Sequence, residues 1–467
     1  MKYIFKYIKN INVISKRNFS LDKNFDVCIV GGGPVGFGLA SLISSEASLK
    51  WKRVVVLESQ SQNLYSQKNN FSNRTVALSP SSRIILEKCG AWNIISQNRH
   101  HPVLKMFVWE QSSESFIAFE KDHMDSNLAY IVETDVLQHA ITSTLNDKRN
   151  VEVKYNTTVT DFQIQPNEAK LTLSDGSKLS ASLLIGADGF HSRIRKLSNI
   201  KSVERNLNQR AIVSVVKFAE EVDNCGVAWQ RFTRYGPIAY LPLDKHHSNL
   251  IWSTTEDNAT RLMGLNEAQF IDELNQEFFT DEYHSKTLNK VNEMLNSIIL
   301  QLPSKLVDSD NYWKIKQLPP VAELLVPNSR ATFPLGFMHA TNYVSHNVAL
   351  VGDAAHRILP LAGQGVNLGF GDDECLVKCL SEGAQVGEST NNYLRLQRYE
   401  TERQRYVIPV AATVQVLNEL YYTNFMPLVI GRAISLKFVN SIKPLKEFFL
   451  DGATQGKLSL NSKYCEK

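Results

Sequence analysis

The residues best suited to chemistry lie between positions 348 and 371, where glycines, one carboxylate and an asparagine follow a short apolar run. The stretch opens as a buried strand, and Gly352-Asp353 turns the chain away from it. A loop of small residues then carries Pro360 and leads into an expected helix near Gly365. Glycine lets the backbone approach a ligand closely. We therefore predict that a planar, electron-rich ligand lies against this stretch.

A glycine loop near the start of the chain has the spacing of a dinucleotide-binding fingerprint. In Gly31-x-Gly33-x-x-Gly36, the first glycine allows a tight turn, the second admits a pyrophosphate, and the third lets helix and strand pack closely. Glu58 ends the next strand, 22 residues beyond Gly36, near where an acid binds the adenosine ribose. The alternative is a strand–turn–helix with chance glycines and a surface glutamate. The flanking strands and helix favour the dinucleotide interpretation.

A second carboxylate, Asp188, ends another apolar strand, in the sequence Leu183-Leu-Ile-Gly-Ala-Asp-Gly. Ligands of open α/β sheets gather at the carboxyl ends of strands, which favours a binding role. Capping of the following helix is the alternative, because aspartate is a good N-cap. Arg74 precedes a further strand. It either lies over the ligand or forms a surface salt bridge, and the sequence leaves both open.

The segments between these motifs carry the signals of a second sheet. Residues 207–255 form alternating runs separated by turn residues, which is typical of an antiparallel sheet. From about residue 265 to 325 the chain becomes more polar and helical, and we expect an insertion of unknown role there. Apolar and aromatic residues broken by charges follow at 406–450. They predict helices packed on the body; a membrane or partner surface is the alternative.

Composition bounds the class of protein and its compartment. The chain has 467 residues, 43% hydrophobic and 21% charged, with a net charge of +4. It lacks a basic stripe with interleaved aromatic residues, which argues against nucleic-acid binding. Its six cysteines are scattered, so neither a metal site nor a disulfide framework is expected. No stretch has the length and apolar character of a transmembrane helix.

The N-terminal segment has the character of a targeting sequence. Residues 1–22 contain lysines and an arginine among apolar and aromatic residues, with no acid before Asp22. A mitochondrial transit peptide is basic, acid-poor and amphipathic in this way. A disordered basic tail is the alternative. We favour the transit peptide.

Three motifs, in this order, resemble the FAD-dependent aromatic hydroxylases, the group A flavoprotein monooxygenases. They are the glycine loop 31–36, Ala187-Asp188-Gly189 with Ser192 and Arg195, and the run from Gly352-Asp353 through His356 and Pro360 to Asn367. Further segments, at 74–79, 130–133 and 230–242, resemble the ubiquinone-biosynthesis hydroxylases. With the transit-like N-terminus, the mitochondrial hydroxylases of ring carbon 5 are the most similar group.

The resemblance implies FAD as the cofactor and assigns roles to single residues. The cofactor-binding residues would be Gly31, Gly33, Gly36, Glu58, Arg74, Asp188, Asp353, Gly363, Gly365, Val366 and Asn367. Asp353 would hold the ribityl chain, and backbone N–H groups from Gly365 onward would stabilise the anionic reduced flavin. Pro360 and Gly365 would lie beside flavin and substrate. His356 ranks below Asp353 because it is expected to be structural, and no residue is assigned as acid or base.

The resemblance also implies a reaction and partners. A C4a-hydroperoxide of the flavin would transfer oxygen to C5 of a polyprenylated 4-hydroxybenzoate-type precursor of ubiquinone. Phe232, Tyr240 and Trp252 are predicted to line the substrate site. Electrons would come from ferredoxin and its reductase or from NADPH. The protein would lie peripherally on the matrix side of the inner mitochondrial membrane, within a biosynthetic complex. A small soluble aromatic substrate, or a structural role for a flavin-bearing subunit, are the alternatives.

The predicted fold is α/β, with a Rossmann-like FAD-binding domain of the para-hydroxybenzoate-hydroxylase type, an antiparallel substrate domain and C-terminal helices. The expected boundaries are a transit peptide at 1–22, an FAD-binding domain at 23–104, 129–200 and 328–405, a substrate domain at 105–128 and 201–327 including the insertion at about 265–325, and a helical region at 406–467.

Overall fold

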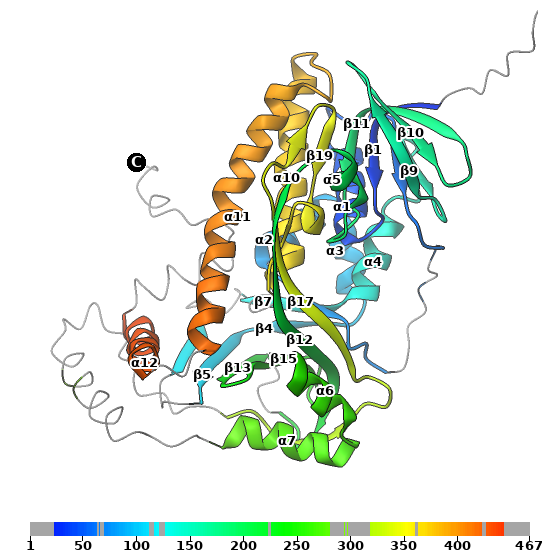
Figure 1. Ribbon diagram of the computed structural model, residues 1–467. Coiled ribbons are helices and arrows are strands. Elements are labelled where there is room, and N and C mark those ends of the chain that lie inside the picture. The colour runs from blue at the N-terminus through cyan, green and yellow to red at the C-terminus, as the bar shows by residue number, and fades with distance from the viewer. Residues whose placement is uncertain are drawn as a thin grey trace, which may run out of the picture.

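The computed structural model describes residues 23–62, 65, 70–111, 116–120, 127–222, 226–280, 294, 297, 318–359, 363–422 and 426–442. The predicted transit peptide at 1–22, Pro360 and most of the insertion at 265–325 lie outside these residues. Two large sheets form the body, one above the other in Figure 1, with a long helix beside them. None of the described helices has the length and hydropathy needed to cross a membrane.

The first sheet is a parallel array that presents the glycine loop at its edge. In spatial order its parallel strands are β19 (Val348–Leu350), β11 (Lys178–Gly186), β1 (Lys23–Val30), β2 (Val54–Leu57) and β8 (Val151–Lys154). Antiparallel strands extend it, namely β9 (Val159–Ile164), β10 (Ala169–Leu173) and β18 (Val344–Ser345). β2 is buried along its whole length, as expected of a parallel strand covered on both faces.

Helices cover the first sheet and connect it to a small third sheet. The helices are α1 (Pro34–Ser45), α2 (Pro80–Lys88), α3 (Ala91–Ser96), α4 (Thr134–Ser143), α5 (Arg193–Leu197) and α10 (Gln364–Gln385). The third sheet is antiparallel, with β7 (Ala129–Glu133) between β3 (Thr75–Leu78) and β4 (His100–Val103). α1 packs on both α4 and α10, so the glycine loop and the 363–371 region lie on neighbouring helices.

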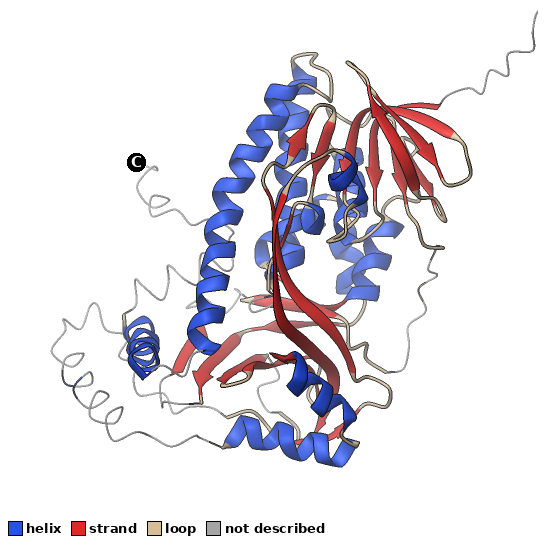
Figure 2. Ribbon diagram, in the orientation of Figure 1, coloured by secondary structure: helices blue, strands red, loops and turns tan. Residues whose placement is uncertain are grey.

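The second large sheet forms the lower half of the molecule in Figure 2. Its strands are, in spatial order, β20 (His356–Arg357), β17 (Ala331–Ala340), β12 (Ser202–Phe218), β15 (His247–Thr255), β14 (Gly236–Pro242), β13 (Val227–Thr233), β5 (Lys105–Glu110) and β6 (Phe116–Glu120), with β16 (Ala322–Leu325) also paired to β12. The long strands β12 and β17 run from the level of the first sheet down into the second.

Two features of this sheet differ from the expected division of the chain. β5 pairs with β13 in parallel, so the sheet is not wholly antiparallel. β17 and β20 also belong to it, although residues 328–405 were expected in the FAD-binding domain. The reason is the length of β12, which pairs antiparallel with β17 from Ser202 to Val213. This pairing places β17 in the second sheet, although β17 lies beyond the expected boundary at residue 328.

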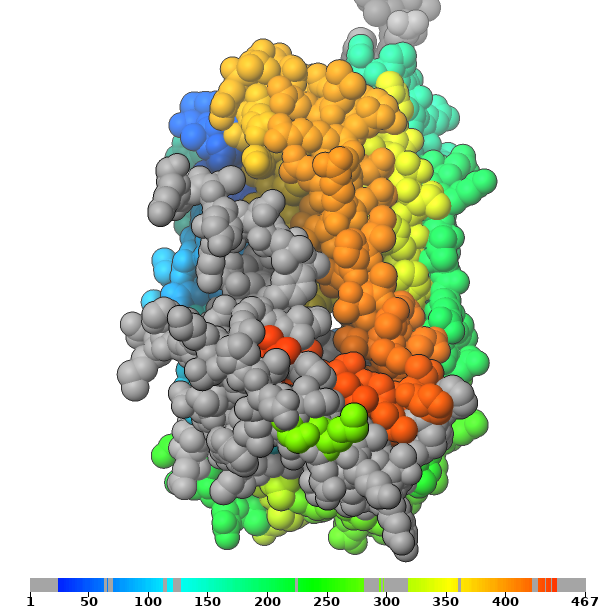
Figure 3. Space-filling view, turned by 90° about the vertical axis from the view of Figure 1, so that its left-hand side faces the viewer, coloured from blue at the N-terminus to red at the C-terminus, as the bar shows by residue number. Residues whose placement is uncertain are grey.

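Different helices cover the two faces of the second sheet. α6 (Glu256–Gly264) and α7 (Glu267–Phe279) lie beneath it in Figure 1 and bury a core of aromatic side chains. α11 (Tyr393–Tyr422) and α12 (Met426–Ser441) reach the opposite face, where Tyr421 and Leu436 are buried against Phe232. α11 crosses most of the height of the face shown in Figure 3.

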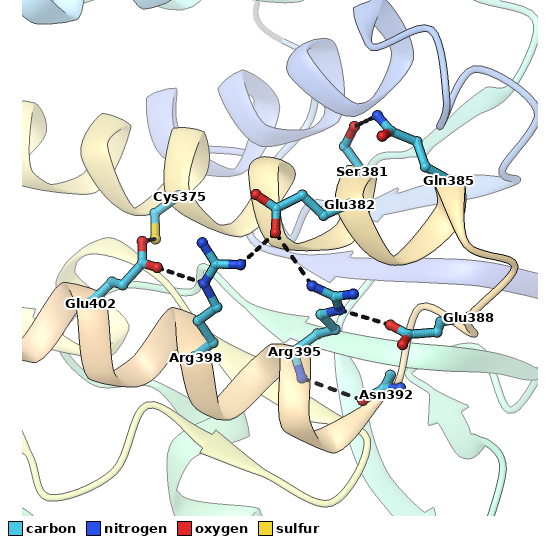
Figure 4. Close-up of polar contacts among 9 residues, drawn as sticks. All are labelled: Cys375, Ser381, Glu382, Gln385, Glu388, Asn392, Arg395, Arg398 and Glu402. Atoms are coloured by element: carbon cyan, nitrogen blue, oxygen red, sulfur yellow. Dashed lines mark hydrogen bonds and ion pairs between the residues drawn. The ribbon is translucent and has the colours of Figure 1, made fainter.

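Charged side chains fasten the start of α11 to α10 (Figure 4). Arg395 donates to Glu388 at 2.8 Å and lies 3.3 Å from Glu382, and Arg398 reaches Glu382 as well. Arg398 also donates to Glu402 one turn further along α11, at 2.7 Å. These pairs are partly exposed, so each adds at most about 1 kcal/mol. Together they fix the direction in which α11 leaves α10.

Candidate functional site

The three glycines of the loop at 31–36 have different surroundings. Gly31 has φ +108°, and a Cβ there would lie 2.3 Å from the carbonyl oxygen of Ala187. A Cβ on Gly36 would lie 1.9 Å from the carbonyl oxygen of Gly31. A Cβ on Gly33 would meet no protein atom within 4 Å. The fold itself therefore requires Gly31 and Gly36, whereas the open space at Gly33 suits the approach of a ligand.

Glu58 stands beside this loop at the end of β2. One carboxylate oxygen accepts the Gly32 N–H at 2.6 Å, and the other accepts the Gln60 N–H at 2.7 Å. Gly33 caps α1 without a side-chain hydrogen bond, so the first N–H groups of the helix face outward. A helix start of this kind attracts phosphate. The geometry fits a dinucleotide whose phosphates lie at α1 and whose ribose lies near Glu58.

The two carboxylate oxygens of Asp188 have different surroundings. One oxygen accepts the N–H groups of Arg193 and Ile194, at 2.7 and 3.1 Å, and so supports the start of α5 as a cap would. The other oxygen is buried and has no hydrogen-bond partner among the described residues. An unpaired buried acceptor costs free energy unless a ligand donates to it. This orphaned oxygen therefore fits a cofactor at the sheet edge.

Asp353 lies on the short 3-10 helix η2 (Gly352–Ala354), directly after β19. Its side chain is exposed. Surrounding protein nevertheless raises the pKa of Asp353 by desolvation, although His356 and Arg357 oppose that rise. The Asp353 side chain is therefore accessible to a ligand although protein surrounds it closely. Arg195 of α5 donates to the Ala354 carbonyl at 2.8 Å and so ties η2 to the Asp188 region.

His356 is a structural residue, as expected. It is 2% exposed, and its Nε2 lies 2.7 Å from Oδ2 of Asp372. Asp372 also accepts the Gly352 N–H at 2.8 Å and the Arg403 Nε–H at 2.6 Å. Burial opposes ionisation of Asp372, but His356 and Arg403 hold its pKa below the ordinary value. Asp372 thus organises the turn that presents Asp353.

No role for Asp372 was predicted from the sequence. In the sequence it is only one of two adjacent acids in an apolar helix. Its spacing does not predict its three partners, which come from β20, η2 and α11. A buried acid in such a helix signals a partner, but the sequence does not show which one.

The start of α10 has the glycine geometry expected of it. Gly363 is the N-cap with φ +60°, and a Cβ there would lie 3.1 Å from Cβ of Ala77. A Cβ on Gly365 would meet nothing within 4 Å, as at Gly33. Val366 packs against the core of the first sheet. The open backbone at Gly365 therefore leaves room for a planar ring system beside the helix start.

The side chain of Asn367 is fully used within the protein. Its oxygen accepts the Ser79 N–H at 2.9 Å and the Ser82 hydroxyl at 2.7 Å, and its amide donates to the carbonyls of Ala77 and Gly363 at 2.8 and 2.9 Å. Asn367 thus ties α10 to β3 and α2. Only its backbone remains for a contact with the cofactor.

Arg74 is the residue directly before β3. Its side chain is exposed, and its carbonyl accepts the Thr134 N–H at 2.8 Å. No ion pair of its guanidinium is found among the described residues, so the surface salt bridge that the sequence left open is not seen there. Glu133, to which the resemblance at 130–133 assigned no role, accepts the Ser72 N–H at 2.6 Å and lies 2.9 Å from Arg99.

The three residues predicted to line the substrate site do not share one face. Phe232 stacks on Tyr421 with ring centroids 3.6 Å apart, on the face that also meets α11 and α12. Tyr240 and Trp252 belong to the opposite core, where Tyr240 stacks on Phe278 at 4.3 Å. They are 1% and 0% exposed. Side chains alternate between the two faces of a strand, and Tyr240 and Trp252 lie on the face covered by α7. They pack in that core and do not line the predicted substrate site.

A large pocket among the described residues lies away from the predicted substrate residues. Its volume is about 930 Å³, and it runs along the outer side of α10 between α1, α2 and α11. It meets the cofactor motifs along the first turns of α10, where Gln364, Asn367, Leu368 and Gly371 line it. The site is therefore defined by the convergence of the glycine loop, Asp188, Asp353 and the start of α10 rather than by this pocket.

The comparisons with known proteins agree with this geometry. Residues 24–296 and 321–413 match the FAD binding domain family. The chain belongs to this family and is an FAD-dependent aromatic monooxygenase with FAD as its cofactor.

Within that class the chain also belongs to the family of the mitochondrial ubiquinone biosynthesis monooxygenase COQ6. It is 40% identical to the Xenopus tropicalis protein of that name over 433 residues, 91% of this chain and 92% of the relative. The Homo sapiens protein is 38% identical over 440 residues, 92% of each chain. The Schizosaccharomyces pombe protein is 31% identical over 454 residues, 93% of each chain.

Solved structures confirm the predicted fold class. The p-nitrophenol 4-monooxygenase PnpA from Pseudomonas putida DLL-E4 is similar, with a TM-score of 0.66 over 94% of this chain and 100% of that one, at 19% identity. PqsL from Pseudomonas aeruginosa, a probable FAD-dependent monooxygenase, gives 0.63 over 88% and 100%, at 18% identity.

Proposed function

We propose that the protein hydroxylates ring carbon 5 of a polyprenylated 4-hydroxybenzoate-type precursor in ubiquinone biosynthesis. The observation that carries the proposal is the 40% identity to a ubiquinone biosynthesis monooxygenase over 91% of this chain. That length includes the second sheet as well as the cofactor motifs. The substrate side of the relative is therefore shared along with its FAD side.

The geometry of the motifs supports the following assignment of cofactor-binding residues. Gly33 and the start of α1 admit the pyrophosphate, and Glu58 accepts from the adenosine ribose. Asp353 accepts from the ribityl chain, while the backbone at Gly365 borders the ring system. The bound flavin supplies the redox chemistry and the activation of dioxygen.

Next to the flavin ring, the N-terminus of α10 contributes to the reaction through its electrostatic effect. The N-terminus of α10 carries a partial positive charge, which stabilises negative charge that develops on the flavin ring. Gly363 starts this helix in the left-handed conformation, and Asn367 locks it to β3. These contacts hold the helix start in place, so no reorganisation is needed when the charge appears.

The substrate ring lies between the flavin and the upper face of the second sheet. This face carries Phe232, and α11 and α12 close one side of it. The stacked pair of Phe232 and Tyr421 excludes water from that side. Exclusion of water is needed because oxygen activated at a flavin is otherwise lost as hydrogen peroxide.

We further propose a mitochondrial location and peripheral membrane contact on the matrix side of the inner membrane. The relatives named above are mitochondrial by name, and residues 1–22 have the composition of a transit peptide. Electrons come from ferredoxin and its reductase or from NADPH. Membership of a ubiquinone-biosynthesis complex belongs to the same proposal.

The test is turnover by the purified holoprotein. A short-tailed prenylated 4-hydroxybenzoate is supplied with dioxygen and with either a ferredoxin system or NADPH, and the product is analysed by mass and by ring position. We expect one added oxygen at carbon 5. A small unprenylated phenol is the control. Turnover of that phenol alone, with none of the prenylated compound, would replace the proposal by the small-substrate alternative.

A further inference from the structure

A largely buried glutamine on the second sheet makes no side-chain hydrogen bond to the described residues. Gln230 lies in the middle of β13, and its side chain is 6% exposed. Among the described residues its amide makes no hydrogen bond. The amide is not fully enclosed, so it reaches the space beside the sheet, where water or a ligand can bond to it. Gln230 is therefore a candidate for a ligand contact.

The side chain points to the face that carries the proposed substrate. Arg231, the next residue, donates to the carbonyls of Glu277 and Thr280 at 3.0 Å and so lies on the α7 side. Because successive side chains of a strand alternate, Gln230 lies on the other side. Phe232, two residues along, shares that side and stacks on Tyr421.

The same face connects to the cofactor motifs. Asn249 of β15 donates to the Thr75 hydroxyl of β3 at 2.6 Å. Two residues further along β3, Ala77 lies against Gly363 at the start of α10. The upper face of the sheet is thus joined through β3 to the backbone that borders the flavin. A group on this face is placed to meet a ring bound next to the flavin.

The surface around Gln230 is apolar and still open. Its direct cross-strand neighbours are Val108 on β5 and Ala239 on β14, and Ile251 follows Ala239 on β15. Ala239 and Ile251 are only half-buried, although their strands lie in the interior of the sheet. The described helices and the third sheet leave Ala239 and Ile251 partly exposed. A single amide set in an open apolar patch has the layout of a site that orients an aromatic ligand by one polar contact.

We propose that the Gln230 amide binds the phenolic oxygen of the substrate ring and so selects a hydroxylated ring. An amide can both donate and accept, so it matches either the hydroxyl or its anion. In apolar surroundings a site built to bond a hydroxyl rejects the analogue that lacks it, because the amide is then left unpaired. The inference rests on the proposed function and names the residue that recognises the reacting ring.

The test compares Gln230→Leu with the unchanged holoprotein on two ring substrates. One is the short-tailed prenylated phenol, and the other is the same compound without the phenolic hydroxyl. Binding is measured from the perturbation of the flavin absorbance, and turnover is measured with the phenol. For Gln230→Leu we expect affinity for the phenol to fall about tenfold to a hundredfold, while affinity for the deoxy compound stays the same or rises.

Thr233→Val is the matched control on the same strand. The Thr233 hydroxyl is buried but bonded to the Gly236 carbonyl at 2.8 Å. This variant loses an internal hydrogen bond and is expected to lower Tm while leaving the preference for the phenol unchanged. Gln230→Leu is expected to keep its Tm and FAD content, because no internal bond is lost.

Two outcomes overturn the inference. The first is a Gln230→Leu variant that keeps the full preference for the phenol. The second is a loss of Tm in that variant with the preference unchanged, which would show that Gln230 serves the fold. If the unchanged protein hydroxylates neither compound, the proposed function fails instead, and the two failures are thereby distinguished.

Discussion

At the scale of single residues, the glycines of the 31–36 loop divide into two kinds. Gly31 and Gly36 are required because backbone atoms already occupy the space where a Cβ would stand. Gly33 has an ordinary extended conformation, φ −74° and ψ 180°, and open space around it. Its small size therefore serves the ligand rather than the chain.

This division predicts opposite failures for two glycine variants. Gly33→Val is expected to fold with near-normal stability and to bind FAD at least about tenfold more weakly, a loss of about 1.4 kcal/mol. Gly36→Ala is expected to lose stability, because its Cβ would press on the Gly31 carbonyl. Flavin fluorescence titration and thermal unfolding of the apoproteins separate the two effects. Normal FAD affinity in Gly33→Val would contradict the assignment of the pyrophosphate to this loop.

Sequence reasoning at this scale was strongest where a residue type has few uses. The glycine spacing predicted the tight geometry of Gly31 and Gly36, and the place of His356 was also foreseen. The sequence did not predict which face of the sheet Tyr240 and Trp252 occupy, because an apolar aromatic residue suits a core and a substrate site equally well. Only the register of β13, β14 and β15 shows which face each residue takes.

At the scale of elements, α10 carries two adjacent acids with opposite electrostatics. Asp372 is bonded to His356, Arg403 and the Gly352 N–H. Asp373 is fully buried, and neither of its oxygens has a hydrogen-bond partner among the described residues. Desolvation, together with the charge of Asp372, raises the pKa of Asp373 well above its ordinary value of 3.8. Asp372 orders the helix, whereas the surroundings of Asp373 favour its neutral form.

Asp373 makes stability depend on pH. Its pKa is raised in the folded state, so its contribution is fully present below the ordinary value of 3.8 and is lost as the pH rises toward the raised value. Asp373→Asn removes this proton and should leave a flatter profile. We expect the variant to gain stability over the wild type as the pH rises above 3.8, measured by urea unfolding. Parallel profiles for the two proteins would show that Asp373 does not bind the proton.

Asp372 gives the contrasting result on the same helix. Asp372→Ala leaves Arg403 buried without its acid, and the loss of one partner from a buried pair costs about 3–5 kcal/mol. Because the Gly352 N–H loses its acceptor as well, FAD retention should fall with stability. An unfolding free energy within about 1 kcal/mol of wild type would rule out this role for the cluster.

The elements themselves were largely predictable. Apolar runs before glycine and aspartate predicted β1, β11 and β19, and the helix expected near Gly365 begins at Gln364. The parallel pairing of β5 with β13 was not foreseen, because the two strands lie more than a hundred positions apart in the chain. Alternation within a strand predicts its two faces but not its neighbour.

At the scale of the whole molecule, the C-terminal helices join the upper face of the second sheet through one buried ion pair. Arg432 of α12 lies 2.6 Å from Glu110 of β5, and the two side chains are 9% and 0% exposed. An exposed pair, Arg205 with Glu419 of α11, joins the same parts of the molecule at 2.7 Å with both side chains more than half exposed. The two pairs share chemistry but differ in burial.

The buried pair should therefore govern the attachment of α12. Arg432→Ala is expected to destabilise the protein by about 3–5 kcal/mol, because Glu110 stays buried without its arginine. Arg205→Ala is the matched control, with an expected cost below about 1 kcal/mol. Limited proteolysis and thermal unfolding report both. Since α12 helps to close the face that carries Phe232, Arg432→Ala should also release more hydrogen peroxide per electron pair consumed. Equal effects of the two variants would contradict the account.

We infer that this chain inserts one atom of dioxygen into a prenylated phenol at its flavin. The most direct measurement is turnover of the short-tailed substrate under ¹⁸O₂ in ordinary water, followed by mass analysis of the product. The account predicts one labelled oxygen in each hydroxylated ring and no labelled product from the Gly33→Val variant stripped of FAD. A hydroxyl oxygen derived from water, or labelled product formed without flavin, would contradict it.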